Sequence, residues 1–138
     1  MALLPLGTLF SAVRLPAELL LAIIGGKAPS RDVDQLLDEV LGGPVICDPR
    51  HARYYALVPA SMPRTWHQAA DDWREVEVDC LGHGTYLGVP RVDAFELRSL
   101  TTYWSVPMQS MATLCAPLDI ARLIAAGRHE MTREQDAT

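Results

Sequence analysis

The chain has 138 residues, of which 49% are hydrophobic and 21% are charged. This length fits one domain, and the composition is that of a folded globular protein, which excludes a repeat array and extended disorder. Twelve basic residues against 17 acidic residues give a net charge of −5, which disfavours nucleic acid as a partner because phosphate-driven binding depends on clustered lysine and arginine. Three cysteines without a C-x-x-C spacing predict reduced thiols and a cytoplasmic location.

The N-terminal segment is predicted to form a strand and then a helix. Residues 9–15 are rich in Phe, Val and Leu and end at Pro16, as a short strand would. Pro16 suits the first turn of a helix over residues 17–24, which Gly25-Gly26 ends. Charged residues interrupt this apolar segment and no basic region precedes it, so it predicts neither a membrane span nor a signal peptide.

The next helix has the clearest pattern in the chain. Ser30 is a favourable N-cap, and Gly42 is placed to end the helix. Asp32 and Asp34 have the spelling of a metal-binding D-x-D motif, but side chains two apart on a helix diverge. Both acids are explained by the positive end of the helix dipole, without a metal ion. An apolar stripe repeats at helical spacing: Val33, Leu36, Leu37, Val40 and Leu41.

From Pro44 onward the pattern changes to strands. Residues 45–47 and 53–58 predict two strands joined by a polar link of hairpin length. Residues 60–75 predict a long polar excursion with one helical turn. Residues 75–80 alternate polar and apolar side chains, which predicts a half-buried strand.

The rest of the chain is predicted to complete the sheet and add a helix. Residues 85–89 read as a strand that returns after a glycine turn, and residues 103–106 read as the last strand. A third helix is expected to begin at Pro117 and to end at Gly127.

These elements predict a single α+β domain over residues 1–127, followed by a disordered tail over residues 128–138. The expected architecture has two layers, with about five mainly antiparallel strands packed against about three helices. Neither an internal repeat nor a domain linker divides the sequence.

Two Cys/His pairs could hold a metal ion. Cys47 and His51 are spaced C-x3-H, and Cys80 and His83 are spaced C-x2-H; zinc accepts two thiolates and two imidazoles. The alternative is two buried thiols and two turn histidines, because free cysteines are among the most buried residues. No motif marks a serine or cysteine as a nucleophile, so we expect no catalytic residue and no cofactor.

Strand aromatics and strand-end arginines suggest a ligand site on the sheet. Aromatic rings on a sheet face can stack on bases, and arginines near strand ends could form a local basic rim. The aromatic residues could instead be ordinary packing residues, as they commonly are in strands. The candidate ligand-binding residues are Arg50, Arg53, Tyr55, Tyr86 and Trp104.

A second candidate surface lies in the polar segment over residues 60–75. Trp66 and Trp73 are predicted to be exposed anchors for a protein partner, because exposed tryptophan is a common hot-spot residue. Asp71 and Asp72 add an acidic character to the same surface. We therefore expect a protein partner, and a homodimer is one such arrangement.

Three segments carry a resemblance to a known family. Residues 78–90 read V-D-C-L-G-H-G-T-Y and continue to a proline, and residues 25–29 read G-G-K-A-P. They resemble the V-D-x-R-G-x-G-G-Y strand–turn–strand and the early G-G-K-x-P element of the bifunctional primase–polymerase (prim-pol) N-terminal domain. Tyr103-Trp104 resembles a later Tyr/Trp pair of that family. The wider layout is similar to small actinobacterial proteins related to this domain.

The resemblance implies a shortened relative without the family's catalytic residues. Leu81 stands where the family has an arginine suited to a nucleotide phosphate, and no strand with a metal-binding carboxylate pair is predicted. The leading hypothesis is a non-catalytic accessory or regulatory binding protein with a prim-pol-like core. The alternatives are a nucleotide- or nucleic-acid-binding accessory factor and a small Cys/His zinc protein or enzyme.

Overall fold

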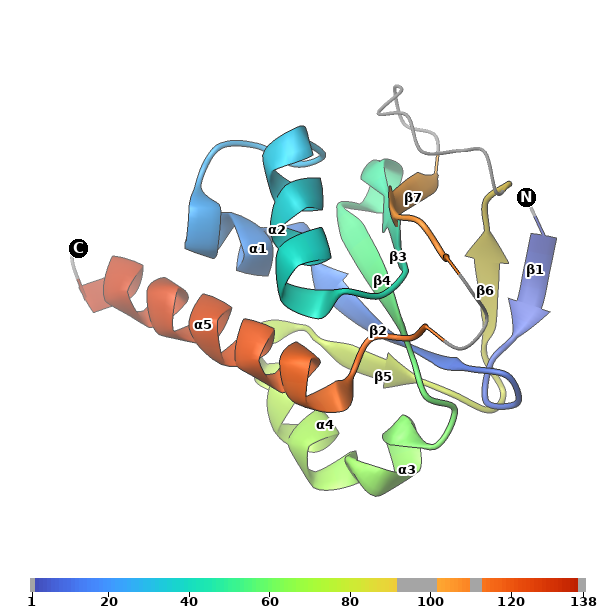
Figure 1. The fold of residues 1–138 in the computed structure, drawn as a ribbon. Coiled ribbons are helices and arrows are strands. Elements are labelled where there is room, and N and C mark those ends of the chain that lie inside the picture. The colour runs from blue at the N-terminus through green and yellow to red at the C-terminus, as the bar shows by residue number, and fades with distance from the viewer. Residues whose placement is uncertain (1, 92–101, 110–112, 137–138) are drawn as a thin grey trace.

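The structure is a computed structural model that describes residues 2–91, 102–109 and 113–136. Helices α1, α2 and α5 cover one face of a five-stranded sheet, and a two-stranded ribbon lies beside the other face (Figure 1). The elements in chain order are β1 (Ala2–Pro5), β2 (Ser11–Pro16), α1 (Ala17–Ile24), α2 (Arg31–Leu41), β3 (Val45–Asp48), the 3-10 helix η1 (Pro49–His51), β4 (Arg53–Val58), α3 (Met62–Thr65), α4 (His67–Trp73), the 3-10 helix η2 (Arg74–Val76), β5 (Asp79–Leu81), β6 (Tyr86–Val89), β7 (Tyr103–Val106) and α5 (Pro117–Asp136).

The predicted α+β class with mainly antiparallel strands is confirmed. The described residues form seven strands and five α-helices, against about five and about three predicted. The main sheet has the strand order β5-β2-β4-β3-β7, and β1 pairs with β6 to form the separate ribbon. Every one of these pairings is antiparallel. None of the helices in the described ranges is long and apolar enough to cross a membrane.

The two faces of the main sheet differ because side chains alternate along each strand. The face under the helices, which we call the covered face, carries Val13, Cys47 and Tyr54 in the larger apolar core. The opposite face, which we call the open face, carries Ala12, Ile46 and Leu57 in a smaller core against the ribbon. The ribbon packs on the apolar part of the open face, and Arg14, Arg53 and Asp79 lie on the same face of the sheet.

Helices α1 and α2 form where the sequence predicts them. Pro16 is the last residue of β2 and also the N-cap of α1, so the proline ends the strand and does not belong to the first helical turn. Ser30 caps α2 by accepting a hydrogen bond from the Val33 amide at 3.2 Å. Gly42 ends α2 with a φ of 61°, a left-handed conformation that glycine adopts without steric cost.

The segment before β5 differs from its prediction. Residues 60–75 contain two short helices, α3 and α4, in place of one helical turn. The strand predicted over residues 75–80 is confined to Asp79–Leu81, because η2 and a left-handed Glu77 (φ 61°) turn the chain just before it. The predicted return of β6 onto β5 is also wrong, since β6 pairs with β1.

Helix α5 is longer than its predicted length. It continues through Gly127 to Asp136, where the sequence indicates a stop and a disordered tail. A Cβ at Gly127 would lie 2.6 Å from the Cδ1 atom of Leu19, so this glycine allows α1 and α5 to pack closely. Arg128 then donates hydrogen bonds to Asp72 at 2.8 Å and to Glu75 at 2.5 Å, which ties the second half of α5 to α4 and η2. Close packing, and not helix termination, explains this glycine.

Candidate ligand-binding site

The strand register places one row of side chains across the open face. Arg14 lies opposite Asp79 on one side and Tyr55 on the other. Tyr55 lies opposite Ile46, and Ile46 lies opposite Trp104. Directly opposed residues have Cβ atoms about 5 Å apart, so neighbours in this row are within contact distance. The row therefore changes from charged at β5 to apolar at β7.

Arg14 forms an ion pair with Asp79 at the charged end of this row. Its Nη2 atom lies 2.5 Å from Oδ2 of Asp79, and the two side chains are 29% and 34% exposed. Because an ion pair this exposed stabilises a fold little, its charge and hydrogen-bonding capacity are its main properties. A guanidinium has five N–H groups, so Arg14 keeps donors beyond the one that contacts Asp79.

A second, shorter row lies next to the first and is also polar. Arg53 lies opposite Pro16 on β2 and opposite Asp48 on β3. Asp48 accepts a hydrogen bond from Nδ1 of His51 at 2.8 Å, and His51 is exposed. A carboxylate only accepts hydrogen bonds, so this contact places the ring hydrogen on Nδ1 and fixes the orientation of the imidazole.

A cavity of about 540 Å³, which we call cavity 1, lies between the open face and the ribbon. The sheet contributes Arg14 and Tyr55, η1 contributes Arg50, and β6 contributes Tyr86, whose side chain is exposed. Pockets of this size hold small-molecule ligands. Its lining residues are Arg14, Ile46, Asp48, Arg50, His51, Tyr55, Leu81, Thr85, Tyr86, Leu87, Gly88 and Thr102.

A second cavity of about 550 Å³, which we call cavity 2, adjoins cavity 1. Arg14 and His51 line both cavities, so these two side chains mark the junction between them. The lining of cavity 2 contains cationic and anionic groups in comparable numbers. Its residues are Arg14, Pro16, Ala17, Glu18, His51, Ala52, Arg53, Arg74, Glu77 and Asp79.

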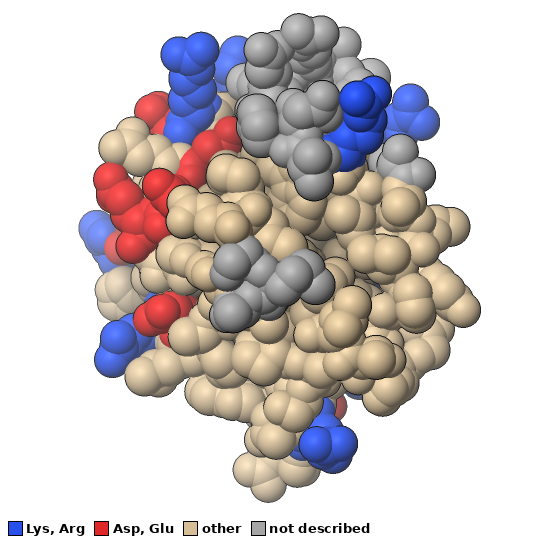
Figure 2. Space-filling model, turned by 45° about the vertical axis from the view of Figure 1, so that its right-hand side comes forward, with Lys and Arg blue, Asp and Glu red and all other residues tan. Residues whose placement is uncertain are grey.

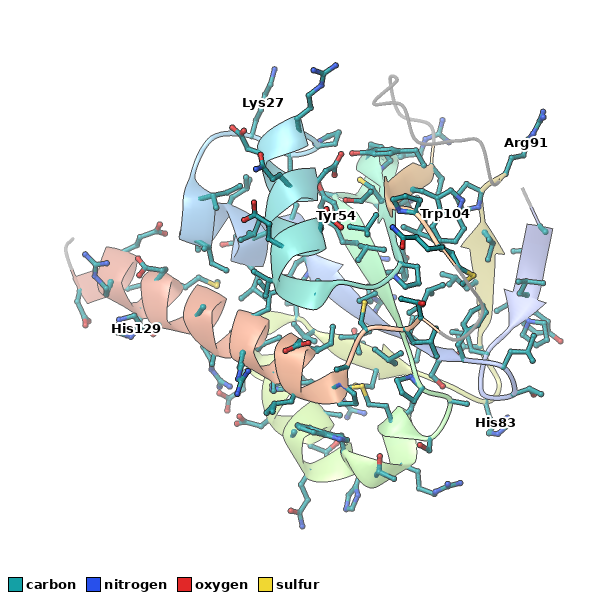
Figure 3. The ribbon with its side chains drawn as sticks, in the orientation of Figure 1. Lys27, Tyr54, His83, Arg91, Trp104 and His129 are labelled. Atoms are coloured by element: carbon teal, nitrogen blue, oxygen red, sulfur yellow. The ribbon has the colours of Figure 1, made fainter. Side chains whose placement is uncertain are left out.

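The structure brings together most of the predicted ligand-binding residues. Arg50, Tyr55 and Tyr86 line cavity 1, and Arg53 lines cavity 2. Trp104 is 4% exposed and lines neither cavity, which corrects its placement in the site. Its indole Nε1 donates a hydrogen bond to the Arg91 carbonyl at 3.0 Å, on the ribbon side of the sheet (Figure 3).

Trp104 instead lines an apolar cavity of about 200 Å³ together with side chains of β1, β4 and β6. Figure 2 brings this side of the molecule forward and shows mainly uncharged side chains there, with the charged groups toward the rim. The lining of this apolar cavity shares no residue with cavity 1 or cavity 2.

The sequence interpretation missed Arg14 and Asp79. Arg14 reads as an interruption of an apolar strand, and only the pairing of β2 with both β4 and β5 shows that it faces Asp79 and Tyr55. The sequence suggests His51 as a metal ligand, whereas the structure pairs it with Asp48. The i, i+3 spacing of Asp48 and His51 around Pro49 is the local signal that could have identified this pair.

The two Cys/His pairs do not come together. Cys47 on β3 and Cys80 on β5 are separated by β2 and β4, which is roughly 14 Å at the usual strand spacing. His83 lies at the far end of the ribbon (Figure 3). Burial raises the pKa of Cys47 and of Cys80 from 9.0 to about 11, so both thiols are protonated at neutral pH. Within the described ranges, no three His, Cys, Asp or Glu side chains are grouped to hold a metal ion.

The Asp32/Asp34 pair also diverges, as expected for a helix. Asp32 is exposed, whereas Asp34 points toward β7 and accepts hydrogen bonds from the Ser105 hydroxyl at 2.5 Å and the Tyr103 hydroxyl at 3.1 Å. Burial raises the pKa of Asp34, and the two hydroxyl donors oppose that shift. Asp34 thus joins α2 to β7 as a structural residue.

The tryptophan pair of the predicted partner surface is mostly internal. Trp73 is only 6% exposed and belongs to the covered-face core, so the prediction of two exposed anchors is wrong for this residue. Its ring stacks on that of Trp66 with centroids 6.2 Å apart, because α3 and α4 fold back against the sheet. Asp71 and Asp72 are exposed, and Asp72 pairs with Arg128 at 2.8 Å.

Comparison with protein-family models, with curated proteins and with solved structures finds no match to this chain.

Proposed function

We propose that this protein is a non-catalytic accessory or regulatory domain that binds a nucleotide-type ligand in cavity 1. The observation that carries the proposal is the convergence of Tyr55, Tyr86 and Arg50 on one cavity from three separate elements, β4, β6 and η1. Two phenol rings suit a planar base, because stacking on aromatic side chains is tolerant of base identity. The guanidinium of Arg50 suits a phosphate, which it can contact with two N–H groups at once.

The location of the resemblance supports the same site. Leu81, Thr85, Tyr86, Leu87 and Gly88 all line cavity 1, and all lie within the segment over residues 78–90 that resembles the prim-pol domain. The proposal therefore includes a prim-pol-like relationship in which the segment contributes to ligand contact. A small ligand needs few phosphate contacts, so the net charge of −5 does not oppose it.

The pairing of the nearby carboxylates supports binding without catalysis. Asp48 is held by His51 at 2.8 Å, and Asp79 is held by Arg14 at 2.5 Å. Each carboxylate therefore has a basic partner of its own, which favours a role in orienting cations over a role as a metal ligand or general base. We infer that the arginines and tyrosines bind the ligand and that the acids position them.

Calorimetric titration with the four common nucleoside monophosphates tests this proposal. At least one should bind, and Tyr55→Ala should weaken its binding by about tenfold or more, since base–aromatic stacking contributes about 1–3 kcal/mol per base. Arg50→Ala should weaken binding similarly through the phosphate, while Arg133→Ala, an exposed arginine on α5, should leave it unchanged. If none of the four nucleotides binds, or if Tyr55→Ala leaves the affinity unchanged, the proposed function is wrong.

A further inference from the structure

Cavity 2 carries features that the proposed nucleotide site does not use. The non-glycine residues with a positive φ in the described part of the chain are Ala52 (53°) and Glu77 (61°), and both line cavity 2. Non-glycine residues rarely adopt this conformation, and such residues cluster at binding and active sites, where surrounding structure holds them in place. They come from distant parts of the sequence, on the β3–β4 and η2–β5 connections. This coincidence marks cavity 2 as a second binding region.

The junction between the two cavities is built from side chains held in place. Arg14 is fixed by Asp79 on the neighbouring strand, and His51 is fixed by Asp48. Both Arg14 and His51 line cavity 1 and cavity 2. An anionic group at the junction would contact the remaining N–H donors of Arg14. If that group carried two substituents, one would enter cavity 1 and the other would enter cavity 2.

We propose that cavities 1 and 2 together bind a phosphodiester of dinucleotide size, with its phosphate at the Arg14–His51 junction, where Arg50, next to His51 in η1, supplies the second guanidinium. The proposal rests on the proposed function, because one nucleoside occupies cavity 1 as described above. A phosphodiester carries two substituents on one phosphate. The two cavities, of about 540 and 550 Å³, meet at Arg14, so each cavity can hold one substituent while Arg14 contacts the phosphate. A phosphomonoester would leave cavity 2 unused.

The chemistry of cavity 2 suits the second nucleoside. The carboxylates of Glu18 and Glu77 can accept hydrogen bonds from sugar hydroxyls or from the amino group of a base. The guanidinium planes of Arg53 and Arg74 can stack on a base. Cavity 1 would therefore bind its nucleoside through aromatic rings, and cavity 2 would bind its nucleoside through charged groups and guanidinium planes.

The experiment compares each nucleoside monophosphate with the corresponding dinucleoside monophosphate by calorimetry. The dinucleotide should bind about tenfold or more tightly for at least one base, which corresponds to the gain of one stacked base. The dinucleotide carries one negative charge fewer at neutral pH because its phosphate is a diester. Nonspecific attraction to arginine therefore predicts the opposite order, and tighter binding of the dinucleotide would require contacts in cavity 2.

Arg74→Ala separates cavity 2 from cavity 1. It should reduce dinucleotide affinity by about tenfold, the contribution expected of a base stacked on a guanidinium, and should leave mononucleotide affinity unchanged. Arg122→Ala is a matched control, because the two arginines have similar surroundings. Arg74 is 71% exposed and lies 3.9 Å from Asp71, three residues before it. Arg122 is 70% exposed and lies 3.9 Å from Asp119, also three residues before it. This control should change neither affinity.

The outcomes distinguish this proposal from the proposed function. If mononucleotides bind in cavity 1 but no dinucleotide binds more tightly, the two-cavity proposal is overturned and the proposed function stands. It is also overturned if the dinucleotide binds more tightly but Arg74→Ala has no more effect than Arg122→Ala. If neither class of compound binds, both proposals fail.

Discussion

The two faces of the main sheet contain similar functional groups in opposite environments. On the covered face, the register aligns Leu15, Tyr54, Cys47 and Tyr103 in one row, and each of these four side chains is at most 2% exposed. On the open face, the adjacent positions of the same strands give the row from Asp79 through Arg14 to Tyr55, which borders two cavities. A shift of one residue along a strand thus moves a side chain from a sealed core to a solvent-accessible site.

The comparison shows that residue type alone does not identify a site. The covered face holds a thiol, two phenols and the Asp34 carboxylate close together, a set that would attract attention in a cleft. Burial raises the pKa of all of them, so each keeps its proton more strongly than it would in water. The Tyr54 side chain is 1% exposed, and it lines neither cavity 1 nor cavity 2. This buried row therefore belongs to the core, and the proposed binding site lies on the other face.

Two adjacent residues of β2 provide the strongest test of this comparison. Leu15→Ala should lower the free energy of unfolding by about 2–5 kcal/mol, because it removes a fully buried side chain and leaves a cavity. Arg14→Ala should change stability by less than about 1 kcal/mol, since its ion pair is partly exposed. Urea denaturation measures both values, and calorimetry should show that nucleotide binding survives Leu15→Ala but not Arg14→Ala. Equal losses of stability in the two variants would contradict the division between the faces.

Thiol reactivity tests whether the covered face is sealed. A thiol with its pKa raised from 9.0 to about 11 has about one-hundredth of the usual thiolate fraction near pH 8, so the buried Cys47 should react at least about 100-fold more slowly than in the unfolded chain. Because the folded state holds these protons more tightly, this contribution to stability is present below about pH 9 and is lost as the pH rises toward about 11. A chromogenic disulfide reagent, with and without urea, measures the rates. Rapid reaction of the three thiols in the native protein would argue against a sealed face.

The smallest predicted effect concerns backbone strain beside the open face. Ala52→Gly should raise the free energy of unfolding by up to about 1 kcal/mol. The left-handed conformation costs a non-glycine residue about 1–2 kcal/mol, and glycine removes this cost. Part of the stabilisation is offset because glycine gives the unfolded chain more conformational entropy. Ala125→Gly is the control, since an exposed alanine within α5 should instead lose about 1 kcal/mol. Thermal denaturation compares the two variants. Destabilisation by both glycines would show that residue 52 is not strained.

The features that the sequence predicts correctly are those with local causes. The cap at Ser30, the stop at Gly42 and the apolar stripe between them define α2 without reference to the rest of the chain. The β3–β4 hairpin likewise follows from two adjacent strand patterns. The sequence predicts a helix stop at Gly127, but this glycine is needed for close packing against Leu19, more than 100 residues away in the chain. The burial of Trp73 likewise depends on how α3 and α4 pack against the sheet, which is not a local property of the sequence.

The site was predicted only in part for the same reason. Arg50, Tyr55 and Tyr86 could be selected as aromatic or basic residues near strand ends, and they do line one cavity. The junction could not be predicted, because the position of Arg14 between Asp79 and Tyr55 requires β2 to be central, between β5 and β4. The sequence order of the strands does not determine that arrangement.

The pairing of β6 with β1 has a mechanical consequence for cavity 1. One wall of the cavity belongs to the main sheet and the other belongs to the ribbon, which is a separate sheet in the described structure. Side chains such as Leu4 and Leu87 hold the ribbon against the open face, and among the described residues no strand ladder joins it to the main sheet. Tilting of the ribbon would change the width of the cavity without breaking a ladder hydrogen bond. A ligand bound as we propose would meet one wall that can move and one wall, the main sheet, that is held by strand-ladder hydrogen bonds.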